Sequence, residues 1–294
     1  MPTMSIQNAD LFYKEQGSGS PILLIHSTGA NADMWGSAFE SLATRNRVIA
    51  YDRRGFSRSA QLSLGDLHQH AEDVAALLRH LHATPATLVG SDTGGVIALD
   101  VAVHHPELVA AVVLCEVNLH LRKQQAISGF FERARLRYLN RAKGARAAAE
   151  AYYMHTLEEK SGESGFERLA KEWREALLAN AEASLREIEA GTGEHLTTQQ
   201  IAGISQPVTC LVSTRSHPFY REVAQQLARE LPKMRSKIVT ATGHYMHLDQ
   251  PSQFVHEIAE ALPGQFKRAD IDSYEQRARQ NHRSVKASSV PKPR

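Results

Sequence analysis

The sequence predicts an α/β fold with a doubly wound, mostly parallel sheet and an inserted helical lid. Three observations lead to this prediction. Short apolar runs of strand length alternate with segments of helical periodicity, which is typical of a parallel sheet between two layers of helices. Some of these runs, such as AVVLC, are apolar throughout, as expected for strands buried on both faces. Between about residues 118 and 205 the alternation stops, and the chain becomes charged, alanine-rich and helical.

The alternating part contains six expected strands and two expected helices between them. Segment 66–83 repeats apolar residues at helical spacing, and segment 95–108 is predicted as a helix that ends before Pro106. The strands are predicted at 21–26, 47–52, 86–90, 109–116, 208–213 and 236–242.

These elements predict how the chain is divided into domains. A core is expected to comprise residues 1–118 and 206–264, and a helical lid is expected at 119–205, between two strands of the core. The remaining segment, 265–294, is a polar, basic tail that we expect to be partly disordered.

The composition restricts the classes of function. Hydrophobic residues make up 42% of the 294-residue chain and charged residues 22%, with a formal net charge of +2, which is ordinary for a soluble enzyme. This balance gives no reason to expect a nucleic-acid partner. We expect no signal peptide and no membrane span, because no apolar run approaches ~20 residues. Cys115 and Cys210 lie in apolar runs, which favours a reducing, cytoplasmic compartment. A homodimer is compatible with the sequence.

The stretch LVGSDTGGVIAL, residues 88–99, has the glycine spacing of a nucleophile elbow. A predicted strand enters a sharp turn there and a predicted helix follows, which is the arrangement that presents a nucleophile. Gly90 and Gly94 stand two residues before and two after Asp92, whereas Ser91 has no glycine at either place. Asp92 is therefore the candidate nucleophile. The alternative is that Asp92 only caps the helix.

Three further stretches, PILLIHSTGANADMW, YDRRGFSRSA and ATGHYMHLDQP, accompany the elbow. With it they make the sequence resemble the α/β-hydrolase fold family over roughly residues 10–118 and 206–264. The resemblance implies an oxyanion hole in the turn that follows the first core strand, where Ser27 replaces the usual glycine. The expected backbone donors are the N–H groups of Thr28 and Thr93.

The resemblance also implies a catalytic histidine in a Gly-His turn near the end of the core, which is His244 here; His247 is the alternative. The usual place of the acid, 214–218, offers no carboxylate. In one branch of the haloalkane dehalogenases the acid instead ends the preceding strand, and Glu116 stands there in this chain. A buried glutamate needs a partner, which a histidine N–H would supply. The alternative is a surface-exposed Glu116.

An aspartate nucleophile implies a different reaction from that of a serine. A carboxylate displaces a leaving group from an sp³ carbon and forms an alkyl ester, which water activated by His244 then hydrolyses. Glu116 would orient the histidine and stabilise its imidazolium form. Haloalkane dehalogenases, haloacetate dehalogenases and epoxide hydrolases are similar to this arrangement. We expect a small, largely apolar substrate, no cofactor and no metal.

The leaving group divides the remaining alternatives. Epoxide hydrolases of the family use lid tyrosines as acids, and a phenol of pKa ~10 stays protonated at neutral pH. Tyr138, Tyr152 and Tyr153 are the candidates in the lid, each with lid packing as the alternative. Dehalogenases typically carry tryptophan after the nucleophile, where this chain has Thr93; Trp173 in the lid is a candidate halide donor or packs the lid on the core.

Epoxide hydrolysis is therefore the first expectation, and haloalkane or haloacid dehalogenation is the alternative. Two other classes stay open. One is a hydrolase-fold enzyme of natural-product metabolism that uses the site for acid–base chemistry, and the other is a non-enzymatic ligand receptor.

Overall fold

One eight-stranded sheet runs through the protein, in the order β1-β2-β4-β3-β5-β6-β7-β8. The computed structural model describes residues 2–6, 9–119, 123–191, 196–231 and 233–263. Strands β3 to β8 are mutually parallel, and β1 and β2 join one edge in antiparallel pairing. The strands are β1 Thr3–Ile6, β2 Ala9–Gln16, β3 Pro21–Ile25, β4 Arg47–Tyr51, β5 Ala86–Ser91, β6 Val109–Cys115, β7 Val208–Ser213 and β8 Arg235–Val239.

The predicted fold class is confirmed, and all six predicted strands form. The structure adds the β1–β2 hairpin, which the sequence analysis did not predict. Strand β2 (ADLFYKEQ) mixes charged and apolar residues because it pairs near the edge of the sheet, so it lacks the continuous apolar run of the central strands.

Helices cover both faces of the sheet. Successive side chains of each strand point to opposite faces, so an apolar strand contributes to a hydrophobic cluster on each side. Leu23 and Ile25 of β3 belong to a hydrophobic cluster with α2, α3 and α10. Ile22 and Leu24 belong to a second cluster, with α1 and α12 on the other face. These helices are α1 Gly36–Ala43, α2 Leu67–His80, α3 Thr93–His104, α10 Pro218–Glu230, α11 Met246–Asp249 and α12 Pro251–Ala261.

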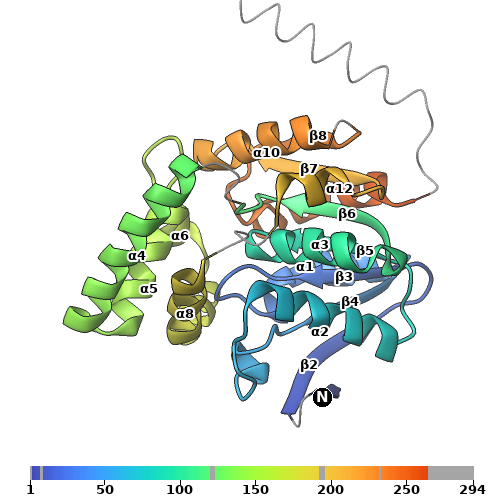
Figure 1. The fold of residues 1–294 in the computed structure, drawn as a ribbon, viewed down its shortest axis with the longest axis horizontal. Helices are drawn as coiled ribbons and strands as arrows, with labels where there is room; N and C mark the ends of the chain where they lie inside the picture. Colours follow the sequence, from blue (N-terminus) through green and yellow to red (C-terminus); the bar gives the residue numbers. More distant parts are fainter. Residues whose placement is uncertain (1, 7–8, 120–122, 192–195, 232, 264–294) are drawn as a thin grey trace, which may run out of the picture.

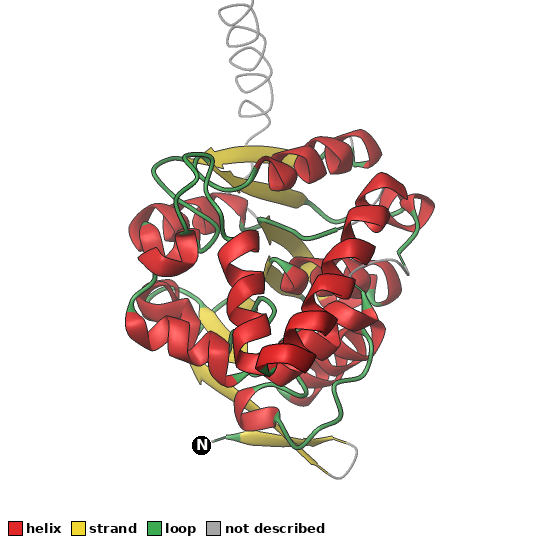
Figure 2. Ribbon diagram, turned by 90° about the vertical axis from the view of Figure 1, so that its left-hand side faces the viewer, coloured by secondary structure: helices red, strands yellow, loops and turns green. Residues whose placement is uncertain are grey.

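Among the described residues, six helices lie between β6 and β7, and we call them the helical insertion. Helices α4 to α8 gather at one end of the sheet, beyond the loops that follow its parallel strands (Figures 1 and 2), whereas α9 packs against α3 and α10 of the core. Their hydrophobic cluster includes Ala30 and Met34 from the loop region after β3 and Tyr245 from the loop after β8, so the insertion packs on the core. The helices are α4 Lys123–Lys143, α5 Ala145–Thr156, α6 Gly165–Arg168, α7 Lys171–Ala179, α8 Ala181–Ala190 and α9 Thr198–Ala202.

The structure leaves the predicted tail undescribed and bears on the expected absence of a membrane span only through the helices that it describes. The predicted tail, 265–294, lies outside the described residues. Among the helices that are described, none is both long enough and apolar enough to cross a membrane.

Candidate active site

Asp92, Glu116 and His244 all follow the carboxyl ends of parallel strands. Asp92 comes directly after β5, Glu116 after β6, and His244 lies in the loop after β8. In open α/β sheets these ends meet at one edge, where ligands bind.

The turn at Asp92 is strained in the way that a nucleophile elbow requires. Asp92 has a φ of +54° and a ψ of −118°, an uncommon conformation for a residue with a side chain. A Cβ at Gly90 would lie 2.2 Å from the carbonyl oxygen of Gly94, and a Cβ at Gly94 would lie 2.2 Å from that of Ile25. The two glycines are therefore needed for the turn to form, and the residue that they present is Asp92 rather than Ser91.

The carboxylate of Asp92 is buried, with 3% of the residue exposed. Its Oδ1 accepts no hydrogen bond from the described residues, and its Oδ2 lies 3.3 Å from the Thr93 hydroxyl. Burial raises the pKa of Asp92 to about 6. Burial outweighs the hydrogen bonds from Thr93, which act to lower the pKa, so the charged form of Asp92 is poorly stabilised.

Glu116 lies next to the elbow and is equally buried, with 1% exposed, so it is not a surface residue. Its Oε1 accepts a 2.6 Å hydrogen bond from the Ser213 N–H at the end of β7. Its Oε2 faces Nδ1 of His244 at 3.9 Å, and neither atom has another hydrogen-bond partner among the described residues. This separation is longer than a hydrogen bond, and such catalytic contacts often shorten when substrate binds. Burial raises the pKa of Glu116 to about 7.

His244 is the histidine that faces this acid. Burial lowers its pKa to about 3, so the ring is neutral at neutral pH and can accept a proton. The alternative base, His247, packs between Trp35 and Phe254, with ring-centroid distances of 4.7 and 5.6 Å, in the cluster on the α1–α12 face. The geometry therefore favours His244 as the partner of Glu116.

The predicted oxyanion turn lies beside the elbow. The hydroxyls of Thr28 and Thr93 are 2.7 Å apart, which brings the backbones of both predicted donors to one place. The Ser27 hydroxyl instead contacts the Tyr245 hydroxyl at 3.2 Å. Ser27 is thus a neighbour of the turn rather than a side chain that points to Asp92.

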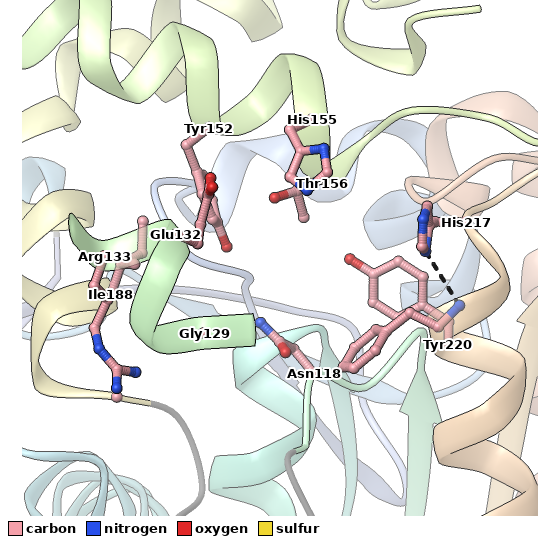
Figure 3. Close-up of a pocket in the computed structure, with 12 residues that line it drawn as sticks. Asn118, Gly129, Glu132, Arg133, Tyr152, His155, Thr156, Ile188, His217 and Tyr220 are labelled. Carbon is pink, nitrogen blue, oxygen red and sulfur yellow. Dashed lines mark hydrogen bonds between the residues drawn. The ribbon is translucent and has the colours of Figure 1, made fainter. Parts of the chain in front are cut away.

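A cavity of about 310 Å³ lies between the insertion and the core. Its lining comes from several helices and includes Tyr152 on α5, Tyr220 on α10, and Asn118 (Figure 3). The Asn118 N–H is 3.5 Å from the Asp92 carbonyl oxygen, and the Tyr220 ring contacts that of His244, with centroids 4.8 Å apart. Asp92 is not among the residues that line the cavity, and Asn118 and Tyr220 connect the cavity to the elbow.

The candidates in the insertion are placed differently from one another. Tyr152 lines the cavity. Tyr138 is 71% exposed on α4, and Trp173 is partly buried against the hydrophobic cluster of the insertion; neither lines the cavity. Tyr153 is buried, and its hydroxyl contacts that of Ser184 at 2.9 Å. Of the three predicted phenols, Tyr152 is the one placed to act on a ligand.

Three residues of this region were missed in the sequence analysis. Tyr220 and Asn118 line the cavity, and Glu187 of α8 is bound under the insertion to Thr28. Tyr220 lies shortly after β7, close to the place where the family usually carries its acid. Its position in the sequence was the one feature that could have marked it as a candidate site residue. Glu187 lies among several charged residues of the insertion, and nothing in the sequence distinguishes it from them.

One group outside this site has the composition of a metal site. His68, Asp100 and His104 offer ligand atoms that lie within 4.8 Å of one another on α2 and α3. Nδ1 of His68 and Nδ1 of His104 lie 3.1 and 2.6 Å from Oδ1 of Asp100. Two imidazole N–H groups are sufficient to stabilise a buried carboxylate, so this geometry is explained without an ion.

Comparison with known proteins supports the same class. The model of the alpha/beta hydrolase family matches residues 22–258. The uncharacterized hydrolase YraK of Bacillus subtilis (strain 168) is 37% identical over 114 residues, which are 38% of this chain and 42% of that protein. A pimeloyl-(acyl-carrier protein) methyl ester esterase of Vibrio vulnificus (strain YJ016) is 23% identical over 267 residues, 85% of this chain and 97% of the esterase. The structure of a thermophilic esterase from Thermogutta terrifontis has a TM-score of 0.74 at 24% identity, covering 88% of this chain and 95% of that one.

The chain therefore belongs to the alpha/beta hydrolase family. The match to YraK spans less than half of that protein's length, and the likeness to the Thermogutta structure shows the fold alone. These findings support the general class of hydrolase. None of the three relatives bears the name of an epoxide hydrolase or a dehalogenase.

Proposed function

We propose that this protein is a hydrolase in which Asp92 forms an alkyl ester with its substrate, and that the substrate is an epoxide. The observation that carries the proposal is a buried carboxylate at the elbow together with two phenols, Tyr152 and Tyr220, in the lining of the cavity next to it. Burial, and next the charge of Asp92, raise the pKa of both phenols well above the usual value. Both therefore stay protonated at neutral pH and can donate a proton to an oxygen leaving group.

In the first step, Asp92 Oδ1 attacks a carbon of the epoxide. The new C–O bond forms as the ring C–O bond breaks, and the released oxygen takes the proton of a phenol. The products are an ester that carries a neighbouring hydroxyl, and a phenolate. Oδ1 is the oxygen assigned to the attack because it accepts no hydrogen bond from the described residues.

In the second step, water gives a proton to His244 and adds to the carboxyl carbon of the ester. The backbone N–H groups of Thr28 and Thr93 would stabilise the oxyanion that forms. The intermediate then collapses, and the alkoxide of the product takes the proton from His244. The restored carboxyl group returns its proton to the phenolate. The sum of both steps is epoxide plus water giving a vicinal diol.

The dehalogenase alternative has less support. The tryptophan N–H group that dehalogenases typically offer to a leaving halide is not found in the cavity lining, which includes neither Trp35 nor Trp173. Trp35 is 1% exposed and packs on His247. A serine-dependent ester hydrolysis is also less favoured, because the elbow presents Asp92 and not Ser91.

The test is to trap the ester. His244→Gln is incubated with a panel of aryl and alkyl epoxides, and the intact mass is measured. We expect a stoichiometric gain equal to the mass of the epoxide, on the peptide that contains Asp92, and no gain in the double variant that also carries Asp92→Asn. An adduct on another residue, or none from any epoxide or haloalkane, would contradict the proposal.

A single turnover of the parent protein in ¹⁸O-water gives an independent measurement. The ester route transfers an oxygen of Asp92 to the first diol and places the heavy oxygen in the Asp92 carboxylate. Direct attack of water on the epoxide would label the diol instead. Label in the first diol therefore excludes the ester.

A further inference from the structure

A buried ion pair lies beneath the insertion, close to the elbow. Arg53, in the loop after β4, and Glu187, on α8, are 0% and 3% exposed at their side chains. The guanidinium holds both carboxylate oxygens, with Nη1 at 2.5 Å from Oε1 and Nη2 at 3.0 Å from Oε2. This bidentate contact is of the kind that is stronger than a hydrogen bond between neutral groups. The pair serves no step of the proposed reaction directly, which raises the question of what it does there.

Two threonine hydroxyls connect this pair to the candidate nucleophile. Thr28 Oγ1 donates to Oε2 of Glu187 at 2.7 Å, and it lies 2.7 Å from Thr93 Oγ1. Thr93 Oγ1 in turn lies 3.3 Å from Oδ2 of Asp92. The result is a row of four oxygen-bearing groups with a carboxylate at each end and three oxygen–oxygen contacts between them.

Counting the available protons shows in which direction the two hydroxyls of this row donate their hydrogen bonds. When both carboxylates are charged, the two hydroxyls supply two protons for three contacts, since each hydroxyl has one proton. The proton of Thr28 is used on Glu187, so the 2.7 Å contact between the threonines takes the proton of Thr93. The contact to Asp92 is then left without one. It is also the longest of the three, at 3.3 Å, as this assignment requires.

We propose that Glu187 is a positioning residue that draws the hydroxyls of Thr28 and Thr93 away from Asp92 and thereby leaves the nucleophile weakly hydrogen-bonded and reactive. The inference rests on the proposed role of Asp92. A carboxylate that accepts fewer hydrogen bonds is less stabilised in its charged form, and protonation becomes easier. Burial is the largest cause of the raised pKa of Asp92, and the charge of Glu187 adds to it, whereas a hydrogen bond from the Thr93 hydroxyl acts in the opposite direction.

Other ionisable groups face this row, and each is unchanged in the threonine variants described below. The phenols and charges around Asp92 and Glu187 are Tyr152, Tyr153, Tyr220, Tyr245, Arg53 and His70. Glu116 and His244 complete the set at the elbow.

Two isosteric variants separate this assignment from its reverse. Thr28→Val removes the acceptor of the Thr93 proton, which frees that hydroxyl to turn to Asp92. We expect the midpoint of Asp92 titration to fall by about one pH unit, the effect of one added hydrogen bond to a carboxylate. Thr93→Val should leave the midpoint unchanged or slightly lower, because Thr93 gives no proton to Asp92 in the parent. If Thr93 instead donates to Asp92, Thr93→Val raises the midpoint and Thr28→Val does not lower it.

The titration can be followed without any substrate. The free energy of unfolding is measured against pH for each protein with and without Asp92→Asn. Asp92 has a folded pKa of about 6, above the ~3.9 of an unfolded chain, so its ionisation destabilises the fold as pH rises across that window. In the Thr28→Val protein, the upper pH limit of this destabilisation, which is set by the folded pKa of Asp92, should be lower. Thr209→Val, buried in β7 outside the row, controls for the exchange of threonine for valine.

A charge-neutral variant tests Glu187 itself. Arg53→Leu combined with Glu187→Leu removes both buried charges together, an exchange that proteins often tolerate. This double variant should lower the midpoint of Asp92 titration, as Thr28→Val does. Where this double variant fails to fold, the comparison of the two threonine variants still decides the outcome.

The rate of Asp92 alkylation is measured independently of the unfolding experiments. If the parent is alkylated by an epoxide, Thr28→Val should slow that step several-fold at a pH where Asp92 is fully ionised, because a better-solvated carboxylate is a weaker nucleophile. A parent that is never alkylated overturns the proposed function, yet the unfolding measurements still test the row. A midpoint that moves in neither threonine variant, or that rises in Thr93→Val, overturns the role of Glu187.

Discussion

The floor and the helical wall of the candidate site are built differently. The floor consists of Asp92, Glu116 and His244, which follow strand ends, and two of them are held in uncommon backbone conformations, with φ of +54° and +49°. The helical wall consists of Tyr152 on α5 and Tyr220 on α10, side chains that project from regular helices. A strained turn restricts which residues can occupy it, whereas a helix accepts almost any side chain at such a position. We infer that the floor sets the reaction and the wall sets the leaving group.

The largest expected effect comes from breaking the floor. Asp92→Asn removes the nucleophile and should lower kcat/KM for an epoxide by ~10³-fold or more. Ser91→Ala should keep most of the activity, because Ser91 is 1% exposed and does not occupy the nucleophile place between the two glycines. Steady-state kinetics on both variants make the comparison. An intact mass confirms that the introduced amide has not hydrolysed back to the acid, and the opposite ranking of the variants would restore a serine mechanism.

Changes in the wall should act on one step only. The double variant Tyr152→Phe with Tyr220→Phe should slow alkylation by ~10²-fold, as expected for lost general-acid catalysis, and the single variants show which phenol donates. Hydrolysis of an ester already formed depends on the floor and should change much less. Tyr138→Phe is the matched control, since Tyr138 is 71% exposed. Single-turnover kinetics separate the steps, and alkylation at the parent rate in the double variant would show that the phenols are not acids.

The helical insertion also needs an anchor on the core, and the residue at the start of α8 supplies it. Asn180, 8% exposed, donates to the Gly29 carbonyl at 2.8 Å and to the Ser57 hydroxyl at 2.9 Å, and accepts from the Ser57 N–H at 2.9 Å. Asn180→Ala should lower the free energy of unfolding by about 3 kcal/mol, roughly 1 kcal/mol for each lost hydrogen bond. Arg146→Ala removes an exposed ion pair of the same insertion and should cost much less, because exposed ion pairs contribute little to stability. Urea denaturation measures both, and equal losses would show that α8 is not the anchor.

The same contrast explains what the sequence could predict. Central parallel strands such as β6 (VAAVVLC) are almost wholly apolar because helices cover both their faces, and their positions follow from that pattern. Asp92 could be found because its turn requires Gly90 and Gly94, which leaves a local signature. Tyr220 and Glu187 have no such signature: each becomes special only when distant segments pack against it. The β1–β2 hairpin was missed for a related reason, since an edge pair needs no continuous apolar run.

The smallest expected effect is a difference in pH dependence between the two steps. Alkylation needs Asp92 charged, and burial raises its pKa to about 6, so the rate should fall about tenfold per pH unit below that value. In the proposed mechanism, hydrolysis needs Glu116 charged to stabilise the His244 imidazolium, and burial raises the pKa of Glu116 to about 7. His244, with a pKa lowered to about 3 by burial, stays neutral over the whole range and adds no inflection. Single-turnover rates should therefore show hydrolysis losing activity about one pH unit before alkylation as the solution is acidified. Glu116→Gln should abolish the inflection of hydrolysis near 7 and leave that of alkylation near 6, whereas identical profiles for both steps in the parent would contradict this division of the floor.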